Sequence, residues 1–151
     1  MRYLETKIVF QEVPGEITLA INISGCPIKC PDCHSKHLWK NDGELLNSKV
    51  VDNLIESNDG ITCICFMGGD ADVSYLQSLF EHIRNNHPTL KIAWYSGDSL
   101  HLDQIKTRCL DYLKVGPYIK EKGPLNSTTT NQRFYRIFNN ELINMTGAFW
   151  K

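Results

Sequence analysis

Short apolar segments alternate with amphipathic segments through most of the chain. Residues 16–24 alternate apolar and polar positions, which predicts a strand. Residues 61–67 form a nearly continuous apolar run, which is typical of a strand covered on both faces of a parallel sheet. The apolar segments at residues 91–95 and 112–115 predict two further strands.

Amphipathic helices are predicted between these strands. Residues 49–56 carry their apolar side chains on one helical face, and Asn47 or Ser48 precedes them as a capping residue. Residues 72–85 and 102–109 predict two more helices. This alternation is typical of a parallel sheet with right-handed crossovers. A complete eight-unit barrel needs about 200 residues or more. We therefore expect an α/β fold, either a partial (β/α) barrel or an open, curved, mostly parallel sheet.

The two ends of the chain depart from this alternation. Lys7–Phe10 predicts a short edge strand. Residues 133–138 and 141–145 flank Asn139-Asn140, a pair that suits the turn of a C-terminal β-hairpin. Three aromatic side chains of this hairpin are expected in the core, namely Phe134, Tyr135 and Phe138.

Composition narrows the class of protein. We expect residues 1–151 to form one globular domain, since 42% are hydrophobic and 22% charged. The net charge of −1 and the lack of a basic run indicate no nucleic-acid partner, and no segment has the length of a membrane span. Residues 1–10 do not have the pattern of a signal peptide, and six cysteines then indicate metal binding in a reducing, cytoplasmic compartment.

Three cysteines follow the first predicted strand. Cys26, Cys30 and Cys33 have C-x-x-x-C-x-x-C spacing in a loop with a glycine and two prolines, which can wrap so that the thiolates converge. Soft thiolates suit zinc or an iron–sulfur cluster. In the zinc interpretation, His34 or His37 is the fourth ligand. In the cluster interpretation, three cysteines leave one iron of a four-iron cluster open for chemistry.

Two further turns are predicted at the same edge of the sheet. Gly68 and Gly69 would let a ligand approach the backbone, and the carboxylate of Asp70 could accept hydrogen bonds from a ligand's ammonium group. The alternative is an ordinary turn in which Asp70 or Asp72 caps the next helix. Ser96 follows the third strand, and it fits a ligand contact or a plain turn equally well.

The cysteine spacing directly after a strand, together with Gly68-Gly69-Asp70, resembles the radical S-adenosylmethionine enzymes, which carry glutamate at the place of Asp70. In that family the open iron of a 4Fe-4S cluster chelates the amino and carboxylate groups of S-adenosylmethionine. The resemblance implies that Cys26, Cys30 and Cys33 hold the cluster. The residues that it implies for S-adenosyl-L-methionine binding are Asp32, His34, Gly68, Gly69, Asp70 and Ser96. His34 has a zinc ligand or a solvated loop residue as alternative roles.

The last third of the chain narrows this resemblance. Gly116-Pro117-Tyr118 and Asn131-Gln132-Arg133 resemble the end of the activating component of anaerobic (class III) ribonucleotide reductase. That resemblance implies that one electron from a flavodoxin-like donor cleaves S-adenosylmethionine to methionine and a 5′-deoxyadenosyl radical. The radical then removes a hydrogen atom from a backbone glycine of the reductase. Residues 131–133 would hold their loop by hydrogen bonds or dock the partner.

Two other functions stay open. The nearer is another radical S-adenosylmethionine enzyme, either an activase of a different glycyl-radical enzyme or an enzyme similar to 7-carboxy-7-deazaguanine synthase. The other is a zinc-binding interaction module without catalysis. The sequence offers no convincing acid–base pair, and hydrogen-atom abstraction needs none. The remaining cysteines, Cys63, Cys65 and Cys109, are predicted to be buried in the core.

Overall fold

The computed structural model describes residues 1–99 and 109–150. Its strands are β1 (Arg2–Val9), β2 (Thr18–Ile23), β3 (Glu44–Leu45), β4 (Cys63–Met67), β5 (Lys91–Tyr95), β6 (Tyr112–Val115), β7 (Arg133–Phe138) and β8 (Glu141–Asn144). Its helical elements are α1 (Ser48–Glu56), α2 (Val73–Asn86) and the 3₁₀-helices η1 (Lys36–Leu38) and η4 (Thr146–Phe149). The predicted helix at residues 102–109 lies outside the described residues, apart from Cys109.

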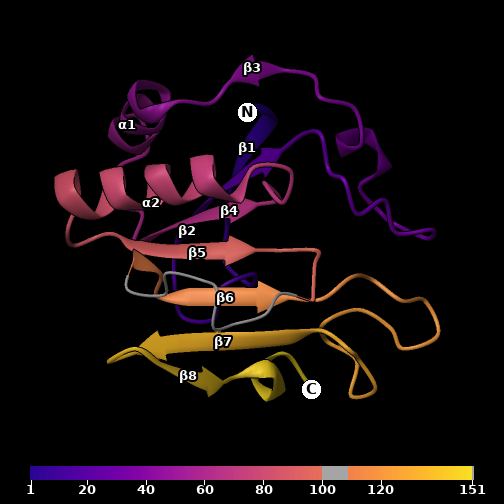
Figure 1. Ribbon diagram of the computed structural model, residues 1–151. Helices are drawn as coiled ribbons and strands as arrows, with labels where there is room; N and C mark the ends of the chain where they lie inside the picture. Colours follow the sequence, from indigo (N-terminus) through magenta and orange to yellow (C-terminus); the bar gives the residue numbers. More distant parts are fainter. Residues whose placement is uncertain (100–108, 151) are drawn as a thin grey trace.

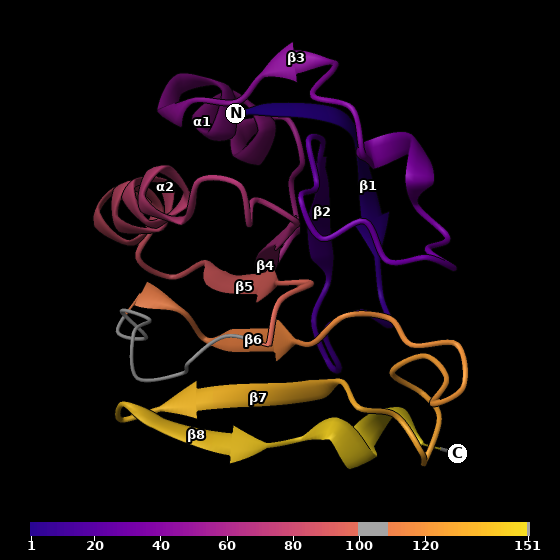
Figure 2. The ribbon, with the colours of Figure 1, turned by 45° about the vertical axis from the view of Figure 1, so that its right-hand side comes forward.

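All described strands belong to one sheet, with the order β3-β1-β2-β4-β5-β6-β7-β8. The four central strands, β2, β4, β5 and β6, are parallel, and the outer pairings are antiparallel. Figure 2 shows the sheet curving from β1 and β2 round to β7 and β8. The sheet is therefore mixed in direction, and closure into part of a barrel stays a prediction. The carboxyl ends of the central strands meet at one edge, where the cysteine loop begins.

The two faces of the sheet are covered differently. Both α-helices lie on one face of the sheet (Figure 1). In β4, Ile64 and Phe66 pack in the core cluster that includes residues of α1 and α2, whereas Cys63 and Cys65 alternate with them and belong to a second cluster on the opposite face. On the helix face, the ring of Phe80 in α2 lies 5.3 Å from the Phe66 ring and 6.0 Å from the Trp94 ring. The central strands β4 and β5 are therefore buried on both faces of the sheet, as their apolar sequences predicted.

Both α-helices begin at side-chain caps. Asn47 accepts a hydrogen bond from the backbone N–H of Val50 at 2.9 Å, and Asp72 accepts one from the N–H of Tyr75 at 3.1 Å. Asp72, and not Asp70, is thus the cap of α2. No helix in the described residues combines the length and the apolar character that crossing a bilayer requires.

The first strand differs from its prediction. Instead of a short edge strand at Lys7–Phe10, β1 extends over Arg2–Val9 between β2 and β3, and Phe10 lies beyond it, 66% exposed. The mixed polar and apolar sequence of β1 gives no clean period. Its pairing with β2 fixes its length, so tertiary contacts decide the strand where the local pattern is weak.

The C-terminal hairpin is present, with β7 over its predicted residues. Phe134 is fully buried, Tyr135 is half-buried and Phe138 is 55% exposed. The expectation that all three aromatic side chains lie in the core is therefore wrong for Phe138. Phe138 shares the face of Phe134 but lies at the far end of the strand, next to the exposed turn at Asn139-Asn140.

Candidate metal centre

The cysteine loop leaves β2 through Gly25, which adopts a φ of +77°. The start of the loop is joined to residues 38–40, which follow the loop. The Gly25 N–H donates to the Lys40 carbonyl and the Cys26 N–H donates to the Leu38 carbonyl, both at 3.0 Å. Further along, the Cys33 N–H donates to the Cys30 carbonyl at 3.0 Å and forms a turn. The loop is thus a closed unit at the carboxyl end of β2.

The three loop cysteines are free thiols of intermediate exposure. The backbone N–H of Ser35 donates to the sulfur of Cys33 at 3.2 Å, the kind of hydrogen bond that stabilises a thiolate ligand. Among the described residues, no group of three or more His, Cys, Asp or Glu side chains forms a ready metal cage. Convergence of the three sulfurs on one centre therefore stays a prediction.

The other three cysteines are buried in the core, as predicted. Burial raises the pKa of the Cys63 thiol to about 12 and raises that of Cys65 well above its ordinary value. Iron is bound by the thiolate and not by the thiol. Cys63 and Cys65 are consequently unsuited to hold a cluster, whereas the loop cysteines are accessible to one.

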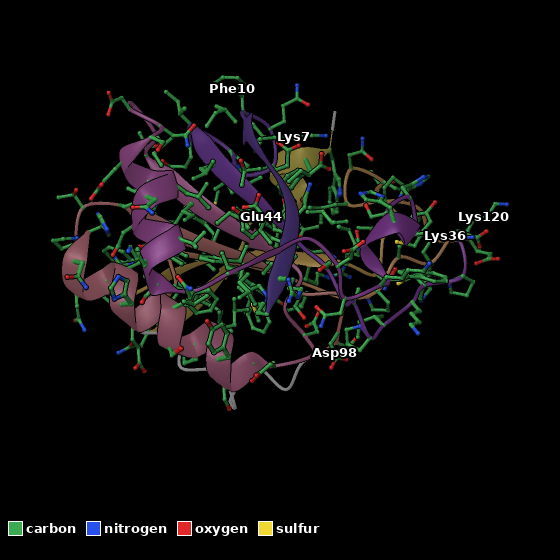
Figure 3. All side chains as sticks on the ribbon, turned by 90° about the horizontal axis from the view of Figure 1, so that it is seen from above. Lys7, Phe10, Lys36, Glu44, Asp98 and Lys120 are labelled. Carbon is green, nitrogen blue, oxygen red and sulfur yellow. The ribbon has the colours of Figure 1, made fainter. Side chains whose placement is uncertain are left out.

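The cysteine loop extends across the ends of β5 and β6. A Cβ placed on Gly97 would lie 3.1 Å from the Ile28 side chain, so the loop packs closely against the backbone just after β5. At the other end of the loop, the His34 ring lies 5.2 Å from the ring of Tyr118, which follows β6. In Figure 3, Lys36 after the loop and Lys120 after β6 lie at the same end of the molecule.

Asp70 is held at this edge by the turn after β5. The Ser96 hydroxyl donates to Oδ1 of Asp70, and the Gly97 N–H donates to Oδ2 at 3.0 Å. Ser96 is 1% exposed, and its hydroxyl also accepts from the Asp98 N–H at 3.1 Å. Ser96 thus positions Asp70, a role that was not predicted, and its contact with a ligand stays a prediction.

Several backbone groups of Gly68 and Gly69 form hydrogen bonds within the protein. Gly68 and Gly69 both have positive φ values, +109° and +93°. However, the Gly68 N–H donates to the Tyr95 carbonyl at 3.0 Å, and its carbonyl accepts from the Trp94 indole at 2.7 Å. The Gly69 carbonyl accepts from the Asp72 N–H at 3.2 Å. The N–H of Gly68 is therefore bonded within the protein, and contact of Gly68 or Gly69 with a ligand stays a prediction.

The remaining predicted ligand contacts lie on the loop surface. Asp32 and His34 are exposed, and Tyr118 is the ring neighbour of His34. The Nε2 of His37 lies 3.8 Å from a carboxylate oxygen of Glu5 in β1. Binding of S-adenosylmethionine by Asp32 or His34 stays a prediction.

A model of the 4Fe-4S single cluster domain matches residues 14–138, which include all six cysteines. The chain belongs to this family. No curated protein and no solved structure matches the chain significantly. As a 4Fe-4S single cluster domain, the chain is an iron–sulfur protein, and its loop of three free thiols with a donated N–H fits the donor set that such a cluster takes.

A buried lysine of this 4Fe-4S domain was not predicted. The ammonium of Lys114, on β6, donates to the carbonyls of Gly116 at 2.8 Å and Ser96 at 3.3 Å. The side-chain amide of Gln132 donates to the same Gly116 carbonyl at 3.3 Å. The signal in the sequence was a single charge inside the otherwise apolar strand Tyr112–Val115.

Residues 131–133 form hydrogen bonds with neighbouring loop segments. Asn131 donates to the Pro117 carbonyl at 3.0 Å, and Gln132 donates to Gly116. Arg133 donates to the carbonyls of Thr130 at 2.7 Å and Gln132 at 2.8 Å. These bonds hold the segment after β6 against the start of β7. Residues 131–133 therefore hold their loop by hydrogen bonds, which is one of the two predicted roles. Docking of a partner by these residues stays a prediction.

A cavity of about 690 Å³ lies on the sheet face opposite the helices. It is lined by the turn at residues 11–14, Tyr95, the loop at residues 124–126 and residues 148–149. Tyr95 also faces the Lys114 ammonium, which lies 5.9 Å from the centre of its ring. Tyr95 thus contacts both the cavity and the buried ammonium of Lys114.

Proposed function

We propose that this 4Fe-4S domain is a radical S-adenosylmethionine activase that generates a glycyl radical on an anaerobic ribonucleotide reductase. When bound, the cluster supplies reductive cleavage of S-adenosylmethionine to methionine and the 5′-deoxyadenosyl radical that takes the glycine hydrogen atom. The observation that carries the proposal is the meeting, at one sheet edge, of three free loop thiols with a fixed carboxylate in a 4Fe-4S family.

In this proposal, Cys26, Cys30 and Cys33 hold the cluster, and Asp70 binds the methionine ammonium. An ionised carboxylate offers about four acceptor positions. The bonds from Ser96 and Gly97 orient Asp70 and occupy one position on each of its oxygens. Two positions are left for a cationic amine, and the shorter reach of aspartate relative to glutamate is offset by this fixed orientation.

The cavity is consistent with a substrate that enters from the sheet face opposite the helices. A volume of about 690 Å³ is within the range of small-molecule sites and also admits a short stretch of extended backbone. The helices cover the other face, so a reductase loop would approach past Tyr95 and residues 124–126. A small substrate, as in an enzyme similar to 7-carboxy-7-deazaguanine synthase, would use the same cavity, so only the reaction separates the two.

We expect the protein to act in the cytoplasm and to receive its electron from a flavodoxin-like donor. Six cysteines without a disulfide among the described residues are consistent with a reducing compartment. The zinc-module alternative needs a fourth ligand beside the three thiolates. An activase needs that position open.

The test is to mix the iron-loaded protein anaerobically with S-adenosylmethionine, reduced flavodoxin and an anaerobic ribonucleotide reductase. We expect a glycyl-radical signal in electron paramagnetic resonance, with formation of 5′-deoxyadenosine and methionine. A reductase whose radical glycine is replaced by alanine is the matched control and should give no such signal. Cleavage of S-adenosylmethionine without a reductase radical would indicate another radical enzyme, and no cleavage at all would contradict the proposal.

A further inference from the structure

Lys114 is linked to the cysteine loop through the turns that follow β5 and β6. Its ammonium bonds to the carbonyl of Ser96, the neighbour of Gly97, and to that of Gly116, two residues before Tyr118. The loop contacts the backbone at Gly97 through Ile28 and the ring of Tyr118 through His34. The two contacts of the loop are therefore made by residues within two positions of the carbonyls that hold the ammonium.

The charge of Lys114 is buried without an ion pair. The residue is 8% exposed, and the salt bridges within residues 1–99 and 109–150 do not include it. Its acceptors in that part of the chain are two carbonyls, so one of its three N–H groups can serve another acceptor. A buried ammonium is costly unless a negative charge lies near it.

Burial lowers the pKa of Lys114 to about 8, and the negative charges of Asp70 and the three loop cysteines act against this shift. The bond of the ammonium to Ser96, the bonds of Ser96 and Gly97 to Asp70, and the contact of Gly97 with Ile28 place Lys114 at the same sheet edge as Asp70 and the cysteine loop. A four-iron cluster held by three thiolates carries a net negative charge, which reduction by one electron increases.

We propose that the ammonium of Lys114 is the counter-charge of the iron–sulfur cluster and raises its reduction potential. Net charge and hydrogen bonding around a cluster are among the main determinants of its potential. A fixed positive charge favours the reduced state, because reduction adds negative charge beside it. The inference rests on the cluster alone and does not require the activase function.

The test is a redox titration of the iron-loaded protein with dithionite, without S-adenosylmethionine, followed by electron paramagnetic resonance. In Lys114→Gln and Lys114→Met, we expect the equilibrium constant for one-electron reduction to fall at least tenfold, a shift of about 59 mV to more negative potential. Lys114→Arg keeps the charge and should remain close to the unaltered protein. Lys49→Gln removes an exposed charge at the start of α1 and should change nothing.

The iron content of each Lys114 variant tests the proposal even if a variant folds poorly. Neutral variants that lose the cluster while Lys114→Arg keeps it also support the requirement for charge. A neutral variant with full iron and an unchanged potential overturns the proposal. Loss of iron from all three Lys114 variants overturns it as well, since the lysine would then be needed for packing and not for its charge.

Discussion

Asp70 and Gly97 are joined across two neighbouring strands, because the Gly97 N–H donates to Oδ2 of Asp70 at 3.0 Å. The Ser96 hydroxyl binds the other oxygen of the same carboxylate. The turn after β4 is thereby fixed to the turn after β5, directly below the place where Ile28 of the cysteine loop contacts Gly97. A carboxylate that a plain turn would leave in solvent becomes an oriented group at the candidate site.

Replacing Asp70 should therefore cost stability as well as ligand binding. In Asp70→Ala, the buried Ser96 hydroxyl and the Gly97 N–H lose their acceptor, and we expect a loss of about 1–3 kcal/mol in the free energy of unfolding. Urea unfolding measures this loss. Asp98→Ala, an exposed aspartate nearby, is the control and should change stability by less than about 0.5 kcal/mol. Equal effects of the two variants would show that the Asp70 contacts carry no weight.

The six cysteines should separate into two groups by iron content. Changing Cys26, Cys30 or Cys33 to Ala should abolish cluster binding, and with it the proposed cleavage of S-adenosylmethionine, since each change would remove one of three proposed ligands. Cys65→Ala should keep its iron, because the burial that raises the pKa of Cys65 keeps its thiol protonated. Iron per chain after anaerobic reconstitution is the measurement. Iron lost from Cys65→Ala, or kept in a loop variant, would reassign the ligands.

Gly69 should not tolerate a side chain. A Cβ at this position, where φ is +93°, would lie 2.8 Å from the side chain of Leu76, which is fully buried in α2. Gly69→Ala combines backbone strain with crowding, and we expect about 3 kcal/mol of destabilisation in urea unfolding. Gly60→Ala has a similar φ of +85° but open space around its Cβ, so about 1 kcal/mol is expected. A comparable loss in both variants would mean that the contact with Leu76 is immaterial.

Glu16 should make the free energy of unfolding decrease at acidic pH. Burial acts to raise the pKa of Glu16, but hydrogen bonds from Lys91, Thr62 and Tyr112 outweigh it and hold the pKa below the usual 4.5. The ionised carboxylate thus contributes stability above pH 4.5, and this contribution disappears as the pH falls through the lowered pKa.

In Glu16→Gln we expect a loss of about 1–3 kcal/mol in unfolding free energy at neutral pH, and a flatter decline of stability in acid. Urea unfolding at several pH values checks both. Glu141→Gln, an exposed carboxylate in β8, should keep the acid decline of the unaltered protein. An unchanged acid decline in Glu16→Gln would contradict the predicted linkage.

The strands that could be predicted are those whose apolar pattern reflects burial. Residues 91–95 and 112–115 became β5 and β6 with the predicted bounds, because both strands are buried in the centre of the sheet. The strand β1 was missed over most of its length. Its residues face solvent in part, and its length is set by pairing with β2 and not by its own sequence.

At the candidate site, the sequence located the edge but not its internal contacts. Cysteine spacing and the glycine pair mark the edge, since both directly follow parallel strands. The bond between Ser96 and Asp70 joins residues 26 positions apart, and the Lys114 contact with Ser96 spans 18. Such contacts depend on which strands are neighbours, so the role of Lys114 emerged only from the fold.

The most direct test of the proposed chemistry is the iron content and the electron paramagnetic resonance spectrum of the reduced protein, with and without S-adenosylmethionine. We expect a brown protein with about four irons per chain, and a reduced-cluster signal that changes shape when S-adenosylmethionine binds the open iron. A colourless protein with bound zinc, or a cluster signal that S-adenosylmethionine leaves unaltered, would contradict it.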